Sequence, residues 1–221
     1  MPVRAFVFDA YGTLFDVHAA ISRHRAAAGP DADRLSDAWR AKQLEFTWTL
    51  TLMGRYEEFW TLSERALDFA LARFPSVDPR LKPKLLDSYR ELDAFPDARS
   101  ALAELKAKGM PTAILSNGAP AMLASAVAAA GLGPLLDHVL SVDAIRIYKP
   151  RREVYELATR ALALPPAEIG FVPSNRWDAA GGAAAGMKAL WVNRGGAPAE
   201  YAELAPAATI KNLSGLAALS L

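Results

Sequence analysis

The sequence contains no cysteine, which excludes disulfide bonds, thiolate metal sites and a cysteine nucleophile. Only three histidines, His18, His24 and His138, could supply imidazole, so a histidine-based metal site or catalytic triad is poorly supplied. An excess of charge of one sign is also missing, because 25 Lys and Arg residues face 24 Asp and Glu residues and both signs are interspersed. We therefore expect no nucleic-acid partner and no membrane partner.

Long apolar runs are missing as well. None reaches the ~20 residues that a membrane span needs, and the first residues lack the basic and apolar regions of a signal peptide. There is no internal repeat and no low-complexity linker. We expect a soluble, cytoplasmic protein, and its 221 residues allow one ordinary domain or a core with a smaller inserted one.

The first stretch with a clear structural signal is Val3–Thr13, which reads VRAFVFDAYGT. Arg4–Phe8 is rich in β-branched and aromatic residues, as is typical of a buried strand, and Asp9 and Gly12 follow it. Ligands of parallel α/β sheets bind at the carboxyl ends of the strands, so Asp9 is a candidate nucleophile or metal ligand. The alternative is a strand-end aspartate that only hydrogen-bonds its own turn.

Helical periodicity without strand-like alternation covers residues 17–92, and strands alternate with helices from Phe95 onwards. The helices predicted in the first block are Val17–Ala28, Asp33–Met53, Arg55–Phe74 and Pro79–Leu92. The strands predicted after it are Thr112–Leu115, His138–Val142, Ile169–Val172 and Ala189–Val192, and the helices are Asp97–Lys108, Ala119–Ala130, Glu153–Ala163 and Ala179–Ala185. The Gly181-Gly182 pair predicts a helix packed closely on the sheet rather than a flexible segment.

This alternation indicates a parallel sheet with right-handed crossovers. The first strand belongs with the later half, so the helical block is an insertion directly after the Asp9 turn. The predicted fold is α/β, with a Rossmann-like parallel sheet core and an inserted four-helix cap. The core would comprise residues 1–14 and 94–221 and the cap residues 15–93, placed over the carboxyl ends of the strands.

Polar residues follow the predicted strands of the later half. They are Ser116-Asn117-Gly118, Lys149-Pro150 and Ser174-Asn175-Arg176-Trp177-Asp178. Each has an ordinary explanation, since Ser and Asn cap helices and Lys before Pro is commonly a solvated loop residue. Those explanations do not account for all of them lying, with Asp9, at one rim of the sheet. We therefore predict a shared active site there.

In this order, Asp9-Ala10-Tyr11-Gly12-Thr13, Ser116-Asn117-Gly118, Lys149-Pro150 and Ser174-Asn175-x-Trp177-Asp178 resemble the four motifs of the haloacid dehalogenase superfamily. More narrowly, DAYGTLFDVH, WRAKQLEFTW, LMGRYEEFW, AILSNG and YKP followed by Val154-Tyr155 are similar to the type II (S)-2-haloacid, or L-2-haloacid, dehalogenases over essentially the whole chain. The resemblance implies the haloacid dehalogenase fold and, because relatives are commonly dimers, a homodimer.

The residues also discriminate within that superfamily. Its phosphatases have a second aspartate in the first motif and further carboxylates in the fourth, where this sequence has Tyr11 and Ser174. Asp9 and Asp178 alone are too few ligands for a strong Mg²⁺ site, because Mg²⁺ requires several hard oxygen ligands. A phosphoryl leaving oxygen needs a proton donor and a halide needs none, so the missing acid favours carbon–halogen cleavage.

The resemblance implies a role for each motif residue. Asp9 would attack the halogen-bearing carbon and form an ester with inverted configuration, while Lys149 would keep Asp9 ionised. Thr13 and Tyr155 would orient the carboxylates, and Ser116 with backbone N–H groups would hold the substrate carboxylate. The fourth-motif residues Ser174, Asn175 and Asp178 complete the catalytic set, with Asn175 and Asp178 activating water.

The predicted cap adds one cation beside an apolar wall. Arg40, Gln43 and Leu44 share a helix face through their i, i+3, i+4 spacing. By resemblance, Arg40, Asn117 and Trp177 form the halide cradle, and the pocket wall consists of Tyr11, Leu44, Phe59 and Trp177. The alternative for Arg40 is a solvated charge on a helix.

One departure from the family pattern concerns Pro173, which replaces the first of two serines before the fourth-motif asparagine. Proline removes a hydroxyl and an N–H and fixes φ. The function predicted is hydrolysis of short L-2-haloalkanoic acids to D-2-hydroxy acids without metal or organic cofactor. The alternatives are a related hydrolase of small acids and a weak or silent relative that binds carboxylates or halide.

Overall fold

The computed structural model describes residues 2–219, and its centre is a six-stranded, all-parallel sheet in the order β3-β2-β1-β4-β5-β6. The strands are β1 (Ala5–Phe8), β2 (Thr112–Ser116), β3 (His138–Ser141), β4 (Ile169–Val172), β5 (Lys188–Val192) and β6 (Ala208–Ile210). Every residue of β1, β2 and β4 is buried, which is why these strands read as apolar runs. The predicted parallel α/β sheet is confirmed.

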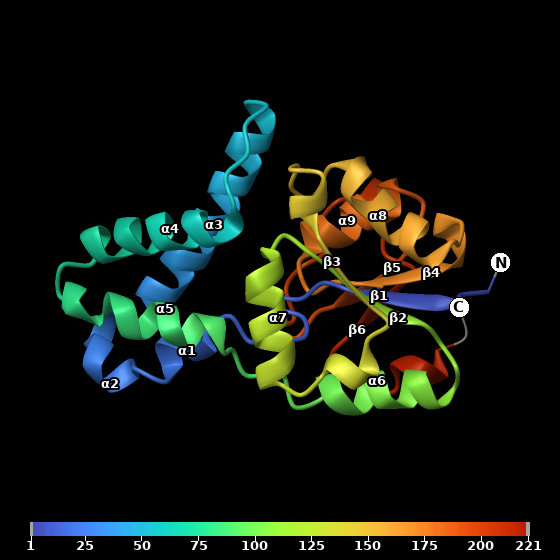
Figure 1. Ribbon diagram of the computed structural model, residues 1–221, viewed down its shortest axis with the longest axis horizontal. Helices are drawn as coiled ribbons and strands as arrows, with labels where there is room; N and C mark the ends of the chain where they lie inside the picture. The colour runs from blue at the N-terminus through green and yellow to red at the C-terminus, as the bar shows by residue number, and fades with distance from the viewer. Residues whose placement is uncertain (1, 220–221) are drawn as a thin grey trace.

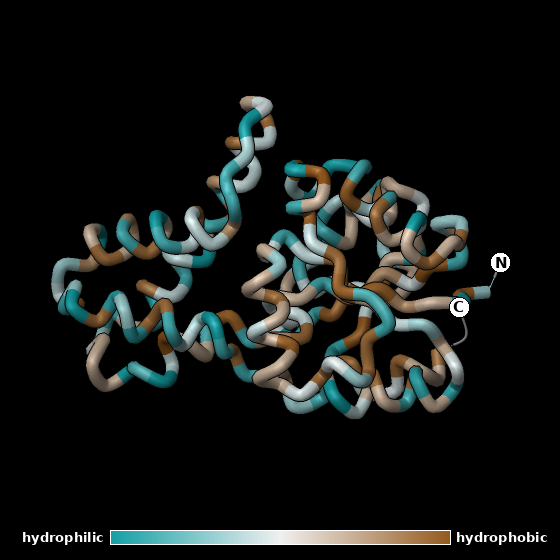
Figure 2. Tube along the Cα trace, in the orientation of Figure 1, coloured by the Kyte–Doolittle hydropathy of each residue, from teal (hydrophilic) through white to brown (hydrophobic). Residues whose placement is uncertain are grey.

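Helices cover both faces of this sheet (Figure 1). They are α6 (Ala98–Ala107), α7 (Pro120–Ala129), α8 (Arg152–Leu162) and α9 (Arg176–Ala184), with α8 and α9 on the side opposite α6. The central strands form the brown, hydrophobic part of Figure 2, whereas the helices alternate with hydrophilic teal. Short 3-10 turns lie at Gly29–Asp31, Pro79–Leu81, Gly133–Leu135, Val142–Ala144, Pro166–Glu168, Ala202–Leu204 and Leu216–Ala218.

The segment between β1 and α6 contains only helices within the described residues. These are α1 (Ala19–Ser22), α2 (Arg25–Ala28), α3 (Ala32–Leu52), α4 (Phe59–Arg73) and α5 (Lys82–Arg90). They lie together beside the sheet, and α3 extends beyond the others (Figure 1). Between residues 2 and 219, no helix combines the length and the apolar character that crossing a membrane requires.

Tertiary contacts account for the boundaries that differ from prediction. The predicted helix Val17–Ala28 is two short helices, because the chain leaves helical geometry at His24, whose Nε2 lies 2.9 Å from Ser88 Oγ on α5. The inserted unit therefore has five α-helices rather than four. Helix α4 begins at Phe59 rather than Arg55, since Tyr148 donates a 2.6 Å hydrogen bond to the Glu57 carbonyl and holds that segment extended.

Two further differences lie in the sheet half. Helix α9 begins at Arg176, directly after Asn175, so the fourth motif opens the helix instead of preceding it. The three-residue strand β6 was not predicted, because ATI is too short to show an alternating pattern.

The inserted helices are joined to the sheet by two adjacent connections. Phe15 and Ala94 form an antiparallel bridge, Asp16 N–H donates to the Asp93 carbonyl at 2.9 Å, and Phe95 N–H donates to the Leu14 carbonyl at 2.8 Å. These contacts lie at the predicted limits of residues 14/15 and 93/94. We propose that they separate a helical cap domain from the sheet domain.

The strand order explains where a ligand can bind. The chain adds β2 and β3 on one side of β1 and then adds β4, β5 and β6 on the other side, so connections diverge between β1 and β4. A crevice forms at such a switch point, beyond the carboxyl ends of the strands. Asp9 follows β1 at this point, and its N–H donates to the Val172 carbonyl at the end of β4 at 3.2 Å.

Close packing of α9 on the sheet, as predicted from its glycines, yields a stability test. A Cβ at Gly182 would lie 2.5 Å from Cδ1 of the buried Phe171 ring. Gly182→Ala should lower the free energy of unfolding by about 1–2 kcal/mol, because overpacking outweighs the gain in helix propensity. Gly195→Ala is the control, since a Cβ there meets nothing within 4 Å. Urea denaturation that shows Gly182→Ala to be as stable as the control would contradict this packing.

Candidate active site

A buried lysine between two carboxylates forms the centre of the site. Lys149 Nζ lies 3.0 Å from Asp9 Oδ1 and 2.8 Å from Asp178 Oδ2, and all three side chains are buried. Burial opposes the lysine charge, but the carboxylates of Asp178 and Asp9 raise the pKa of Lys149 above its usual value. The cation therefore stays protonated and lies between the two acids.

Asp178 is the acid farther from the surface. Burial raises its pKa to about 6, although Lys149 acts in the opposite direction. Its Oδ1 accepts a 2.7 Å hydrogen bond from the Tyr155 hydroxyl, and burial raises the pKa of Tyr155 well above its usual value. Tyr155 therefore remains a neutral donor. Both Asp178 oxygens have partners, so this residue orients Lys149 from behind the cavity.

Asp9 is held from its other oxygen by the first and fourth motifs. Thr13 Oγ1 donates to Asp9 Oδ2 at 3.1 Å, accepts from the Ser174 N–H at 2.9 Å and lies 3.1 Å from Ser174 Oγ. The Trp191 indole N–H donates to the Ser174 carbonyl at 2.9 Å and braces this loop from β5. The preceding Pro173 is buried, and its carbonyl accepts from the Val192 N–H at 2.9 Å.

A small cavity lies above Asp9 and Lys149. Every residue lining it was predicted as a site residue, namely Asp9, Tyr11, Arg40, Leu44, Phe59, Ser116, Asn117, Lys149, Asn175 and Trp177. The other predicted site residues, Thr13, Tyr155, Ser174 and Asp178, support Asp9 and Lys149 from outside the cavity. The structure thus brings all of them together, and their individual roles stay proposals.

Two turns at strand ends supply polar groups to the cavity. Asn117 Oδ1 accepts from the Lys149 N–H at 3.1 Å, which leaves the amide NH₂ group for another partner. Ser116 Oγ accepts from the Gly118 N–H at 3.0 Å, so its own proton can be donated to an anion. Gly118 permits close approach, because a Cβ there would lie 2.6 Å from the Tyr11 ring.

The helices supply one cation and an apolar wall, as predicted. Arg40 Nη2 donates to the Tyr11 carbonyl at 3.2 Å and leaves further N–H groups on the cavity side. Tyr11 stacks on Phe59 and Tyr89, and its buried hydroxyl has no hydrogen-bond partner within residues 2–219. An anion bound beside Arg40 could accept from this hydroxyl, since burial raises the Tyr11 pKa and keeps the group protonated.

Gln43 does not line the cavity, although it lies one turn from Arg40. Its amide donates to Ser63 Oγ on α4 at 3.0 Å and accepts from the Tyr89 hydroxyl on α5 at 3.3 Å. It therefore joins three helices of the insertion. The i+3 position is displaced about 60° around the helix from residue i, which turns Gln43 inward.

Sequence reasoning missed two residues next to the site, Trp191 and Trp48. Trp191 had no signal, because it lies outside every motif. Trp48 lies on α3 one turn after Leu44 and two turns after Arg40, and its ring meets Trp177 edge-on at 5.4 Å between centroids. The same helical spacing that indicated Leu44 could have indicated Trp48.

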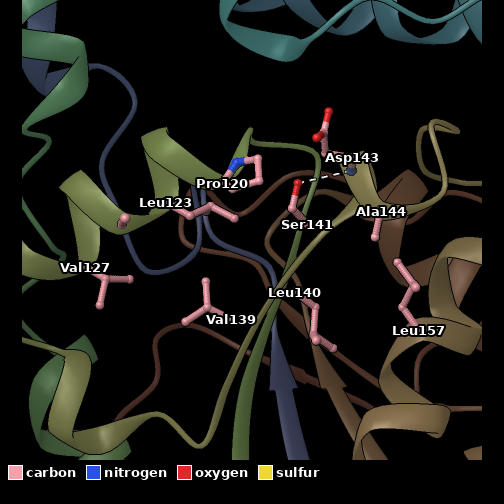
Figure 3. Close-up of a pocket in the computed structure, with 10 residues that line it drawn as sticks. Pro120, Leu123, Val127, Val139, Leu140, Ser141, Asp143, Ala144 and Leu157 are labelled. Atoms are coloured by element: carbon pink, nitrogen blue, oxygen red, sulfur yellow. Dashed lines mark hydrogen bonds between the residues drawn. The ribbon is translucent and has the colours of Figure 1, made fainter.

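Other hollows and clusters do not compete with this site. The apolar hollow in Figure 3 lies between α7, β3 and α8, and no predicted site residue lines it. Across residues 2–219, no three His, Asp or Glu side chains are grouped as metal ligands would be. The charged side chains of the active site are Lys149, Arg40, Asp9 and Asp178.

Comparison with known proteins finds a family model and relatives that all concern haloacid dehalogenases. A family model described as haloacid dehalogenase-like hydrolase matches residues 3–186. The chain is 48% identical to (S)-2-haloacid dehalogenase 1 of Pseudomonas sp. (strain CBS-3), over 100% of this chain and 97% of the relative. It is 46% identical to (S)-2-haloacid dehalogenase 4A of Burkholderia cepacia, over 92% of this chain and 88% of the relative.

This chain belongs to the haloacid dehalogenase-like hydrolases. The solved L-2-haloacid dehalogenase of Xanthobacter autotrophicus, with chloropropionic acid covalently bound, is 36% identical to the hydrolase and has a TM-score of 0.88, covering 98% of this chain and 97% of that one. The family match includes Asp9, Lys149 and Asp178 and ends before β5. The Trp191 brace thus lies beyond the matched residues.

The charges of the hydrolase site predict opposite responses to two substitutions. Asp178 should be protonated below about pH 6 and ionised above it. Lys149→Met should raise the Asp178 pKa further, because it removes the nearby cation, whereas Asp9→Asn should lower it, because it removes a like charge. Carboxyl-carbon NMR over a pH range measures both shifts. Asp137, whose pKa is lowered chiefly by Lys106, serves as the internal control. Shifts of equal sign in both variants would contradict this coupling.

Proposed function

We propose that this hydrolase removes halide from short L-2-haloalkanoic acids and yields D-2-hydroxy acids through an ester on Asp9. The observation that carries the proposal is the Asp9–Lys149 ion pair, which lines a small cavity together with Arg40 and the rings of Tyr11, Phe59 and Trp177. A carboxylate nucleophile, a fixed cation and a cradle for a leaving anion are the groups that this reaction requires. The relatives named above support the same reaction class.

In the first step, one Asp9 oxygen attacks the carbon that bears the halogen. The new C–O bond forms as the C–halogen bond breaks, and the halide leaves with the bonding electrons, so no proton is required. Attack from the side opposite the halogen inverts the carbon. Arg40, the Asn117 amide and Trp177 receive the halide, while Ser116 Oγ–H holds the substrate carboxylate.

In the second step, water adds to the carbonyl carbon of the ester and restores the Asp9 carboxylate. The water gives one proton to the departing oxygen, which had belonged to Asp9 and becomes the hydroxyl of the product, and the other proton to the surrounding solvent. Asn175 lines the cavity and can position this water. Asp178 acts through Lys149, because its own oxygens already bind Lys149 and Tyr155. The covalently bound chloropropionic acid of the Xanthobacter relative supports a covalent path.

Isotope labelling tests whether Asp9 is a nucleophile. In one turnover with excess enzyme in heavy-oxygen water, the label should enter Asp9 and not the product, because water attacks the ester carbonyl. Mass spectrometry of the Asp9 peptide and of the hydroxy acid reads both sites. Asp9→Asn is the control and should take up no label. Label found directly in the hydroxy acid would identify Asp9 as a base that activates water.

We expect Pro173 to slow hydrolysis of the ester more than its formation. Asp9, Thr13, Arg40 and Lys149 are all in place for ester formation, whereas Pro173 brings neither a hydroxyl nor an N–H to the loop before Asn175. A missing hydrogen bond made in the transition state costs about 1–3 kcal/mol. Pro173→Ser should therefore raise the steady rate about tenfold and reduce the amount of ester seen by mass spectrometry during turnover.

Pro165→Ser, at an exposed position before β4, is the matched control and should leave both measurements unchanged. An unchanged or lower rate in Pro173→Ser would mean that the loop works without the second hydroxyl. If neither the wild type nor Pro173→Ser releases halide from any 2-halo acid of either hand, the alternative gains support that the protein is a silent relative that binds carboxylates or halide.

A further inference from the structure

The reaction cavity is too small for a substrate in this form of the protein. Its cavity volume is only about 10 Å³, which is enough for about one water molecule. A 2-halo acid can therefore enter only when a wall moves. Asp9 and Lys149 are buried and joined by an ion pair, so the floor is fixed.

Trp177 is the wall with space behind it. It borders a hollow of about 560 Å³, which Trp48, Leu52 and Tyr201 line together with the charged residues Lys149, Arg151 and Glu200, and a second hollow of about 620 Å³. Within residues 2–219, it is the single residue that lines both hollows and the reaction cavity. A shift of its indole would join the cavity to one of these spaces.

Trp48 limits that shift. Its ring, on α3, meets the Trp177 ring, on α9, edge-on at an interplanar angle of 84°. The Trp48 indole N–H is buried and has no hydrogen-bond partner among the described residues, so packing alone holds this ring. Trp48 lines the first hollow but not the reaction cavity, whereas Trp177 lines both.

We propose that Trp48 determines substrate chain length. By holding Trp177, it separates the reaction cavity from the largely apolar hollow that both rings line, and so restricts turnover to short 2-halo acids. When Trp177 is released, the alkyl tail of a longer acid extends into the hollow, while its carboxylate and halogen stay beside Ser116 and Arg40. The identity of the substrate in this inference rests on the proposed dehalogenation, whereas the arrangement of Trp48 and Trp177 does not.

Comparison of two substrates tests the proposal. Halide release is measured with L-2-chloropropionate and L-2-chlorohexanoate for the wild type, Trp48→Ala, Trp48→Phe and Trp60→Ala. Each buried methylene contributes about 0.8 kcal/mol, or about fourfold in affinity, and the longer acid has three more. Trp48→Ala should raise the preference for chlorohexanoate by at least about tenfold, mainly through a lower KM, and Trp48→Phe by less.

Trp60→Ala is the matched control. Trp60 is a half-buried tryptophan on α4 that donates to Glu64 and borders a separate hollow, so the chain-length preference should not change. A folded Trp48→Ala with the wild-type preference would overturn the proposal. If Trp48→Ala does not fold, the test uses Trp48→Phe instead. An unchanged chain-length preference in that variant would also overturn the proposal.

Binding of unreactive acids separates this inference from the proposed function. Calorimetry with propionate and hexanoate should show the same gain for hexanoate in Trp48→Ala without requiring turnover. That gain in a protein that releases no halide would support the role of Trp48 while the dehalogenase proposal fails. If the enzyme releases halide from short acids but Trp48→Ala shows no gain for the longer acid in either assay, the dehalogenase proposal is supported and the role of Trp48 is refuted.

Discussion

The site depends on one buried cation that two carboxylates share. Taking Lys149 out of water is costly, and the contacts with Asp9 and Asp178 offset that cost only while both carboxylates stay in place. Each acid therefore has a second anchor, Thr13 for Asp9 and Tyr155 for Asp178. Asp9 and Thr13 follow β1, Lys149 precedes α8, and Tyr155 and Asp178 lie on α8 and α9. The arrangement therefore forms only when the ends of the strands are placed correctly.

The inserted helices convert this charged floor into an enclosed chamber. Arg40 and Leu44 come from α3 and Phe59 from the start of α4, while the sheet half supplies the reactive carboxylate. Tyr56 and Tyr148 add hydrogen bonds between the two parts, to Asp143 and to the Glu57 carbonyl. Exclusion of bulk water from so small a chamber strengthens each electrostatic contact within it. The sheet half thus supplies the carboxylate, its lysine and the Trp177 wall, and the insertion supplies Arg40 and the rest of the apolar wall.

Much of this arrangement could be predicted from local patterns. The buried strands β1 and β4 match their predicted positions closely because apolar runs at strand length, followed by polar turns, are strong local signals. The gathering of Asp9, Lys149 and Asp178 followed from the rule that parallel strands end at one rim. Motif resemblance then indicated Arg40, which periodicity alone could not distinguish from a solvated charge.

What the sequence did not predict depends on contacts between distant segments. The break at His24 and the late start of α4 at Phe59 are set by partners on α5 and in the loop before Lys149. Trp48 and Trp191 act through neighbours that no local window contains. The homodimer, the cytoplasmic location and the independence from metals and cofactors stay predictions, because none of them is a property of the folded contacts within one chain.

The paired connections near Asp16 and Asp93 have a consequence for how such a protein can diversify. Because a 2.9 Å hydrogen bond joins the two ends of the insertion, the chain leaves and re-enters the sheet half at one place, whatever the length of the insertion. Closing a longer or shorter loop there changes the chain entropy little. Insertions of different length and shape can therefore follow the same strand end, and selectivity can evolve in these helices while Asp9, Lys149 and Asp178 stay in place.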